Sequence, residues 1–387
     1  MRPRRALRLA LSAALLCAGV GHAQPLAAPL QDEDVPRILT LGPWPPPLAL
    51  DPSNRVSGRP AAIAFGATLF HERRLSRDGS LSCASCHQPA RGFSDGLPRA
   101  QGLQPGTRNT LALANLGQQR WFGWDGANDN LWAQSLRPLL DAREMGSSLS
   151  QVAATVRGTP ELGAAYRRAF GHAPGADDER VAVDTAKALA AYQETLRTPR
   201  TPFDDFRDAL ARGDRAAAAA YPAAAQRGLA LFLGRGRCHV CHGGPNFSNG
   251  EFSDIGRPFF IASGQVDPGR HGGIQALQRS RYNLLGPYND DATRATAIST
   301  RHVRLDHRHY GEFKVPSLRN LAHTAPYMHD GSLTTLRDVL QHYSELDENR
   351  LHADGEAILV PLRLTAQQTD DLLAFLDSLN APGGAPR

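Results

Sequence analysis

The 387-residue sequence predicts a mainly α-helical protein built from two related domains with long loops. A short cysteine–histidine motif occurs twice. Each copy follows a similar segment, Gly66-Ala67-Thr68-Leu69-Phe70 or Gly228-Leu229-Ala230-Leu231-Phe232, and each precedes a Phe-Ser pair, Phe93-Ser94 or Phe247-Ser248. Apolar residues recur at helical spacing elsewhere, most clearly over residues 181–197. The repeat predicts a duplicated module, and the length of the chain suits two domains.

The first 23 residues are typical of an export signal. Four arginines precede an apolar stretch, residues 9–20, that is too short to span a bilayer, and Gly21-His22-Ala23 offers small residues for cleavage. We therefore expect residues 1–23 to be a signal peptide and the mature protein to be periplasmic. No other stretch is long and apolar enough for a membrane span.

The charge composition argues against a nucleic-acid or membrane partner. The chain has a formal net charge of +5, but four of its 43 basic residues lie in the signal peptide. The mature chain is therefore nearly neutral, and no basic face is indicated. Four of the five cysteines lie in the two motifs and the fifth lies in the leader, so we expect no disulfide.

The mature chain divides into three expected parts. Residues 24–57 are proline-rich and predict an extended arm over the surface. Residues 58–212 and 213–387 each contain one motif and form the two expected domains. In the second domain we expect Thr365 to cap a C-terminal helix together with Gln368, and residues 243–313 to consist of loops.

The repeated motif is Cys-x-x-Cys-His, the attachment sequence of c-type haem. Its two copies are Cys83-Ala84-Ser85-Cys86-His87 and Cys238-His239-Val240-Cys241-His242. The two thiols close thioethers to the haem vinyl groups, and the adjacent imidazole becomes the proximal iron ligand. A zinc site is the alternative. It is weaker because a histidine directly follows the second cysteine in both copies. The sequence thus predicts two cytochrome c-like haem domains.

The sixth ligand of each haem decides what the protein does. A haem with one protein ligand can bind peroxide, whereas a haem with two strong ligands mainly transfers electrons. Residues 88–171 contain no histidine, and Met145 is their only methionine, so the first haem is expected to be open. Glu144 is our candidate for the acid–base group that peroxide cleavage requires, with Gln134 as its companion, although a lone glutamate is usually a solvated surface residue.

Several further motifs carry a resemblance that covers the whole mature chain. The sequence resembles the bacterial di-haem cytochrome c peroxidase and MauG family. In addition to the two haem motifs, the matching segments are Arg108-Asn109-Thr110, Trp124-Asp125-Gly126, Glu144-Met145-Gly146, residues 313–320, residues 324–331 and residues 335–343.

The resemblance implies roles for individual residues. Glu144 and Gln134 match the distal acid–base residue and its neighbour at the peroxidatic haem, and Trp124 matches the tryptophan between the haems. Asn109, Thr324 and Pro326 match a site for one calcium ion, whose hard oxygen ligands would come from both domains.

Two departures from the family pattern affect the expected mechanism. Many relatives carry a histidine shortly before the position of Asn109 that blocks the first haem until the second is reduced, whereas residues 101–108 contain none. The second departure is Tyr343, which stands where peroxidases place a methionine ligand and resembles the MauG arrangement. Met328 and His342 are the alternative ligands of the second haem.

We therefore expect a periplasmic peroxidase that reduces hydrogen peroxide with electrons from a small c-type cytochrome or cupredoxin. The alternative is a MauG-like enzyme that oxidises side chains of a partner protein, and a pure electron carrier is less favoured. An open first haem argues against the carrier, while Tyr343 favours the MauG-like alternative. Six further histidines are interpreted as surface residues (His71, His172, His302, His307, His309 and His352).

Overall fold

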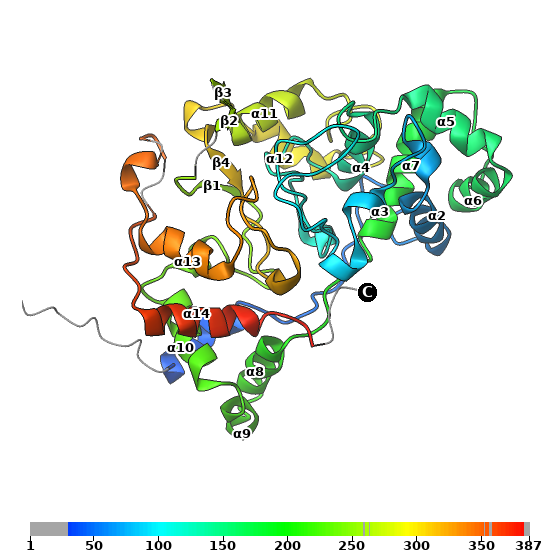
Figure 1. Ribbon diagram of the computed structural model, residues 1–387. Coiled ribbons are helices and arrows are strands. Elements are labelled where there is room, and N and C mark those ends of the chain that lie inside the picture. The colour runs from blue at the N-terminus through cyan, green and yellow to red at the C-terminus, as the bar shows by residue number, and fades with distance from the viewer. Residues whose placement is uncertain (1–29, 258–259, 263, 352, 356–357, 383–387) are drawn as a thin grey trace, which may run out of the picture.

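The computed structural model describes residues 30–382 except 258–259, 263, 352 and 356–357. The predicted signal peptide lies outside these residues. The described chain is mainly α-helical, and its two halves lie side by side (Figure 1). None of the described helices has the length and apolar character that crossing a bilayer requires.

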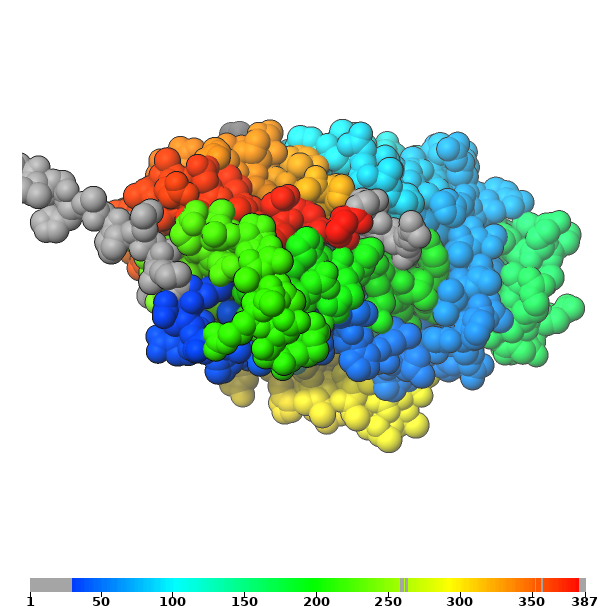
Figure 2. Space-filling model, turned by 90° about the horizontal axis from the view of Figure 1, so that it is seen from below, coloured from blue at the N-terminus to red at the C-terminus, as the bar shows by residue number. Residues whose placement is uncertain are grey.

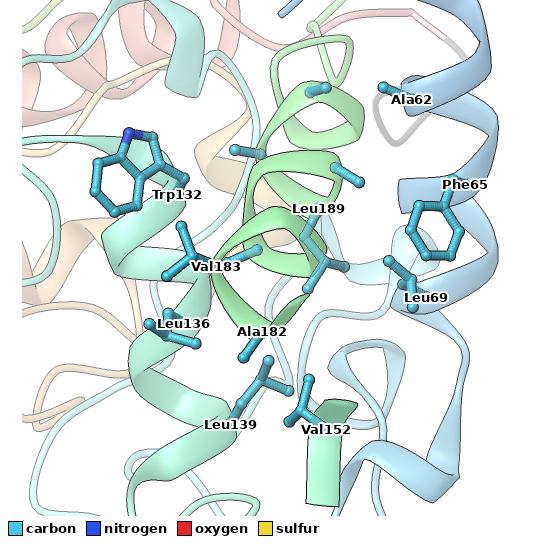
Figure 3. Packing of buried hydrophobic residues seen from close by; sticks show 14 of the residues in the cluster. Ala62, Phe65, Leu69, Trp132, Leu136, Leu139, Val152, Ala182, Val183 and Leu189 are labelled. Atoms are coloured by element: carbon cyan, nitrogen blue, oxygen red, sulfur yellow. The ribbon is translucent and has the colours of Figure 1, made fainter. Parts of the chain in front are cut away.

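The first half contains seven helices among the described residues. They are α1 (Val35–Leu39), α2 (Pro60–Phe70), α3 (Cys83–Cys86), α4 (Leu131–Leu140), α5 (Leu149–Gly158), α6 (Pro160–Phe170) and α7 (Asp178–Gln193). Helices α2, α4 and α5 pack on α7, and α6 packs on α2 and α5. Figure 3 shows residues of this core, including Phe65, Trp132, Leu136 and Leu189. The helix predicted over 181–197 begins earlier, at Asp178, because the side chain of Asp177 caps it, and it ends earlier, at Gln193.

The second half has fewer long helices and two small antiparallel sheets. Its elements are α8 (Pro202–Ala211), α9 (Arg215–Ala219), α10 (Ala223–Leu233), α11 (Gly269–Arg279), α12 (Ile298–His302), α13 (Leu336–Ser344) and α14 (Ala366–Asp377), with β1 (Phe252–Asp254) paired to β4 (Glu312–Lys314) and β2 (Phe260–Ala262) paired to β3 (Gln265–Val266). The predicted cap at Thr365 and Gln368 is confirmed. The expectation of loops over 243–313 is wrong in part, since α11 and the strands lie there.

A second hydrophobic core joins α8, α10 and α14. Its centre is an aromatic cluster of Phe203, Phe232, Phe247 and Phe375, whose ring centroids lie 4.9–6.1 Å apart in successive pairs. Helix α8 precedes residue 213, where we place the domain boundary from the sequence, yet Phe203 packs in this second core.

The proline-rich arm is not simply an extended surface segment. Pro36 stands in the first turn of α1, where its missing N–H costs no hydrogen bond. Ile38, Leu41 and Trp44 are buried, and the Trp44 indole donates to the Thr198 carbonyl at 2.9 Å. The arm therefore contributes to the second core, and it lies beside α8 and α9 in Figure 2.

The two halves repeat one helix-packing arrangement. A Cβ on Gly66 of α2 would come within 2.0 Å of the Ala188 carbonyl oxygen in α7. A Cβ on Gly228 of α10 would meet the Asp371 carbonyl oxygen of α14 at the same distance. Each glycine therefore allows two helix backbones to touch, and the Gly-x-x-Leu-Phe repeat of the sequence is explained by this packing.

Candidate active site

The two haem motifs open into one large central cavity of about 1790 Å³. Both cysteines and the histidine of each motif line it, namely Cys83, Cys86, His87, Cys238, Cys241 and His242. All four cysteines are free thiols. Burial raises the pKa of Cys83 to about 12 and that of Cys86 to about 11, with neighbouring acidic groups adding to the effect. These thiols are thus protonated in the unmodified chain.

Both motif histidines are held in the orientation that a proximal ligand needs. Nδ1 of His87 lies 2.9 Å from the Phe93 carbonyl oxygen, and Nδ1 of His242 lies 3.1 Å from that of Phe247. The carbonyl fixes the proton on Nδ1 and leaves Nε2 as the ligand atom. Burial lowers the pKa of both imidazoles, which favours the neutral form that binds iron. Cavity size, thiols and imidazoles together fit two covalently bound haems.

The repeated sequence continues beyond the haem motifs with constant spacing. Asn115 and Asn320 both adopt left-handed backbone conformations, and Asn130 and Thr335 both cap the helix that follows, α4 or α13. Asn115 precedes Asn320 by the same number of residues as Asn130 precedes Thr335. In this register Trp124-Asp125-Gly126 corresponds to His329-Asp330-Gly331, a repeat that the sequence shows but that we did not predict.

The halves meet through a nearly symmetrical contact around these residues. The Asn109 N–H donates to the His329 carbonyl at 2.7 Å, and the corresponding Lys314 N–H donates to the Trp124 carbonyl at 2.8 Å. The Trp124 indole also donates to the Asn109 carbonyl at 2.8 Å, and its ring centroid is 6.5 Å from that of His329. His329 stacks on Phe313, and burial lowers its pKa to about 4. Trp124 therefore lies at the junction of the halves.

Glu144 and Gln134 line the part of the cavity formed by the first half. Glu144 accepts from the Arg137 guanidinium at 2.9 Å and is partly exposed, whereas the Gln134 side-chain oxygen accepts from Asn128 at 2.8 Å. The segment that lacks the family histidine lies directly beside Glu144. Leu103 N–H donates to the Glu144 carbonyl at 2.9 Å, and a Cβ on Gly102 would come within 2.7 Å of the Glu144 Cα.

The shared register also allows the distal sides of the two haem sites to be compared. Tyr343 is the eighth residue of α13, and the eighth residue of α4 is Pro138. Both residues line the cavity. Proline offers no ligand atom in its side chain, so the first site has no counterpart of Tyr343 at this position.

Tyr343 lies in the wall of the cavity near the second motif. Burial raises the pKa of its phenol, and the two motif thiols contribute further. Of the alternative ligands, His342 directs Nε2 to the Ile255 carbonyl oxygen at 2.8 Å and does not line the cavity, whereas Met328 does line it.

The three residues matched to a calcium site all line the cavity near the junction. The Asn109 side-chain amide donates to the Leu97 carbonyl at 2.8 Å. The Thr324 hydroxyl donates to the Leu321 carbonyl at 3.3 Å, and Pro326 is buried. Within the described ranges, no group of three or more His, Cys, Asp or Glu side chains is arranged to hold a metal. The resemblance implies a different kind of site, built from amide, hydroxyl and carbonyl oxygens.

Comparisons with known proteins agree with the geometry. The family model described as di-haem cytochrome c peroxidase matches residues 60–212. The chain is 35% identical to the methylamine utilization protein MauG of Methylorubrum extorquens, over 84% of this chain and 80% of that one. It is 34% identical to the cytochrome-c peroxidase IdrP1 of Denitromonas iodatirespirans, over 97% and 93%.

A similar solved structure is that of a MauG-like protein associated with microbial copper homeostasis. It matches with a TM-score of 0.67 and 28% identity, covering 88% of this chain and 95% of that chain. The likeness therefore extends over both halves of the molecule.

Proposed function

The chain belongs to the di-haem cytochrome c peroxidase family, which includes MauG, and from this premise we propose a peroxidase with a permanently open first haem. It is an oxidoreductase of the cytochrome-c peroxidase type with two haem c groups. Its proposed reaction converts one hydrogen peroxide, two electrons and two protons into two waters. The electrons come from a small c-type cytochrome or cupredoxin in the periplasm.

The observation that carries this proposal is the pair Pro138 and Tyr343. When bound, the haem iron provides the binding site for peroxide and the electrons that cleave its O–O bond. Pro138 leaves the distal side of the first site open, and residues 101–108 supply no histidine to close it. Two backbone hydrogen bonds, from Leu103 and Gln104 to Glu144 and Arg143, hold this segment. No reductive activation is therefore needed.

We assign the proton transfer to Glu144. Its carboxylate would take a proton from one peroxide oxygen and deliver it to the other, which leaves as water. Arg137 orients the carboxylate through its 2.9 Å contact. The Gln134 amide orients peroxide, and Trp124 lies on the route by which electrons arrive from the second site. A calcium ion held by Asn109, Thr324 and Pro326 would link the halves beside this route.

A MauG-like oxidation of a partner protein is the second candidate, and Tyr343 is the observation that favours it. A phenolate ligand stabilises ferric iron and lowers the reduction potential of the second haem, which disfavours ordinary electron relay. The assignment of Tyr343 as ligand can be tested directly. Replacing Tyr343 by Phe should alter the ferric absorption spectrum of the second haem, and an unaltered spectrum would assign the ligand elsewhere.

The deciding experiment uses oxidised protein that has never been reduced. It is mixed with hydrogen peroxide and then with reduced c-type cytochrome in a stopped-flow instrument. Rapid, repeated oxidation of the cytochrome is the result expected for the peroxidase. A long-lived oxidised protein that the cytochrome quenches slowly would favour the MauG-like enzyme, and no peroxide reaction before reduction would refute the open first haem.

A further inference from the structure

Two buried cations line the central cavity without a carboxylate partner in the described part of the chain. Four basic side chains with little solvent exposure face it: Arg108, Arg270, Lys314 and Arg319. Arg319 is paired with Asp204, and Arg108 with Asp125 and Asp267. Arg270 and Lys314 form no ion pair with any residue that the structure describes. Burying an unpaired charge is unfavourable, so an anionic partner is expected for these two.

The contacts of the two cations leave donors unused. Lys314 is 5% exposed, and its ammonium makes one hydrogen bond, to the Gly250 carbonyl oxygen at 3.3 Å. Arg270 is 3% exposed, and its Nη1 donates to the carbonyls of Asp125 and Gly126 at 3.2 and 2.8 Å. An ammonium has three donors and a guanidinium has five, so the carbonyls satisfy only part of this capacity.

The two side chains are neighbours in one structural unit. The Arg270 guanidinium lies between the rings of Trp121 and Phe252, 4.4 and 4.1 Å from their centroids, and the Lys314 ammonium lies 5.8 Å from the Phe252 centroid. Burial lowers the pKa of Lys314 to about 8, the Glu251 carboxylate opposes this shift, and the positive charge of Arg270 adds to it. Each positive charge therefore raises the free-energy cost of burying the other until an anion binds.

The unit lies beside the second haem motif. Phe252 of β1 is directly opposite Lys314 of β4 in the sheet register. The next residue of β1, Ser253, has its hydroxyl oxygen 3.7 Å from the Cys241 thiol. Successive side chains of a strand point to opposite faces, so Phe252 and Lys314 lie on the face away from Ser253. A haem attached at Cys241 would carry its anionic groups, two propionate carboxylates, on the porphyrin edge away from the thioethers. Lys314 and Arg270 line the same cavity as Cys241.

We propose that Lys314 and Arg270 form the binding site for a propionate carboxylate of the second haem. The inference rests on the haem attachment in the proposed function but not on its peroxide chemistry. Lys314 occupies the position that Asn109 has in the first half, so at this position of the repeat only the second half carries a cation. The site therefore makes the second haem electrostatically different from the first.

The test is spectroelectrochemistry of the di-haem protein, with both reduction potentials measured for wild type and Lys314→Met. A cation near a haem favours the reduced form, so its removal should shift the equilibrium of the second haem about tenfold toward ferric iron, or 59 mV. The first haem should shift less than threefold, and Lys314→Arg should restore the wild-type potential. A larger shift at the first haem would assign the carboxylate to that haem and overturn the proposal.

The matched control is Arg120→Met, which removes a nearby cation that is well exposed and does not line the cavity. An equal shift of the reduction potential in Arg120→Met would mean that long-range electrostatics causes the effect. It would refute a direct contact between Lys314 and the propionate. Resonance Raman spectra provide the second readout, because the propionate bending band of the second haem should move in Lys314→Met and not in Arg120→Met. If Lys314→Met accumulates without haem, Arg270→Gln takes its place, and an unmoved band there also refutes the site. None of these readings needs peroxide turnover.

Discussion

At the scale of single residues, Glu144 has the most specific assigned task. It lines the cavity, accepts from Arg137, and lies beside the segment that lacks a blocking histidine. Replacing it by Gln keeps the size of the side chain and removes the proton acceptor. We expect peroxide turnover to fall by about 10²- to 10⁴-fold, the range typical of general acid–base catalysis. Stopped-flow oxidation of a reduced cytochrome measures this loss.

The matched control for Glu144 is Glu161→Gln, at the exposed start of α6. Its turnover should equal that of wild type, and both variants should retain both haems by absorption. A Glu144→Gln protein with wild-type turnover would remove Glu144 from the mechanism and leave the proton transfer to another group or to water.

A second acidic residue, Glu194, affects stability rather than catalysis. It is 6% exposed, one carboxylate oxygen accepts from Ser57 at 2.7 Å, and the other has no hydrogen-bond partner among the described residues. Burial raises its pKa from 4.5 to about 7. The folded protein therefore holds this proton more tightly than the unfolded chain. The contribution of Glu194 to the free energy of unfolding falls as pH rises from 4.5 to about 7.

Glu194→Gln should remove this pH dependence. At pH 5 the variant and wild type should be about equally stable, and at pH 8 the variant should be more stable by about 3 kcal/mol. Urea unfolding of the holoprotein at both pH values measures the difference. A variant that is equally destabilised at both would mean that Glu194 is charged in the folded protein.

At the scale of elements, the comparison between α4 and α13 explains how one repeat can form two different sites. Their caps, Asn130 and Thr335, set the same register, and the eighth residue of each helix lines the cavity. This residue is Pro138 in α4 and Tyr343 in α13. In the proposed function, a change of one residue at the same helix position therefore separates an open first site from a second site with Tyr343 as its ligand.

This argument predicts that Pro138→His closes the first haem. The imidazole would stand where Tyr343 stands in the second site and would bind the open iron position. The ferric spectrum of the first haem should change from high-spin to low-spin, and peroxide turnover should fall at least 100-fold. Pro138→Ala is the control and should stay high-spin and active. A high-spin, active Pro138→His protein would show that the two helices are not equivalent.

At the scale of the whole molecule, the parts of the site differ in how far the sequence predicts them. Thioether chemistry requires fixed spacing, so Cys83, Cys86 and His87 are evident in the sequence. The surface arm and the loops over 243–313 are predicted only in part, because packing decides where they depart from the prediction. Trp44 is buried against Thr198, and α11 forms where Gly273 touches the Asp125 backbone. Such long-range contacts leave no local pattern.

The site that we assign to Lys314 and Arg270 illustrates the same limit. Lys314 belongs to a segment that matches the family, but its lack of a carboxylate partner becomes visible only when β4 pairs with β1. Arg270 reaches the cavity because α11 packs on the first half. The sequence therefore reveals the groups that bind haem covalently, whereas the charges around the haem require the assembled structure.

The junction of the halves depends on one arginine from the first half. Arg108 donates to both carboxylate oxygens of Asp267 in the second half, at 2.6 and 2.7 Å, and to Asp125 at 2.6 Å. Its backbone neighbour Asn109 makes the hydrogen bond to His329 that joins the halves beside Trp124. Removing the guanidinium would leave two carboxylates, one of them almost fully buried, without a cation.

Arg108→Met should therefore lower the stability of the holoprotein by about 3 kcal/mol, because a broken buried ion pair leaves an uncompensated charge. Arg337→Met is the control, since its pair with Asp370 is exposed on both sides and should contribute less than about 1 kcal/mol. Urea unfolding measures both. If the junction also positions Trp124, electron transfer between the haems after flash reduction should slow in Arg108→Met alone. Equal losses of stability in the two variants would show that the junction does not depend on this ion pair.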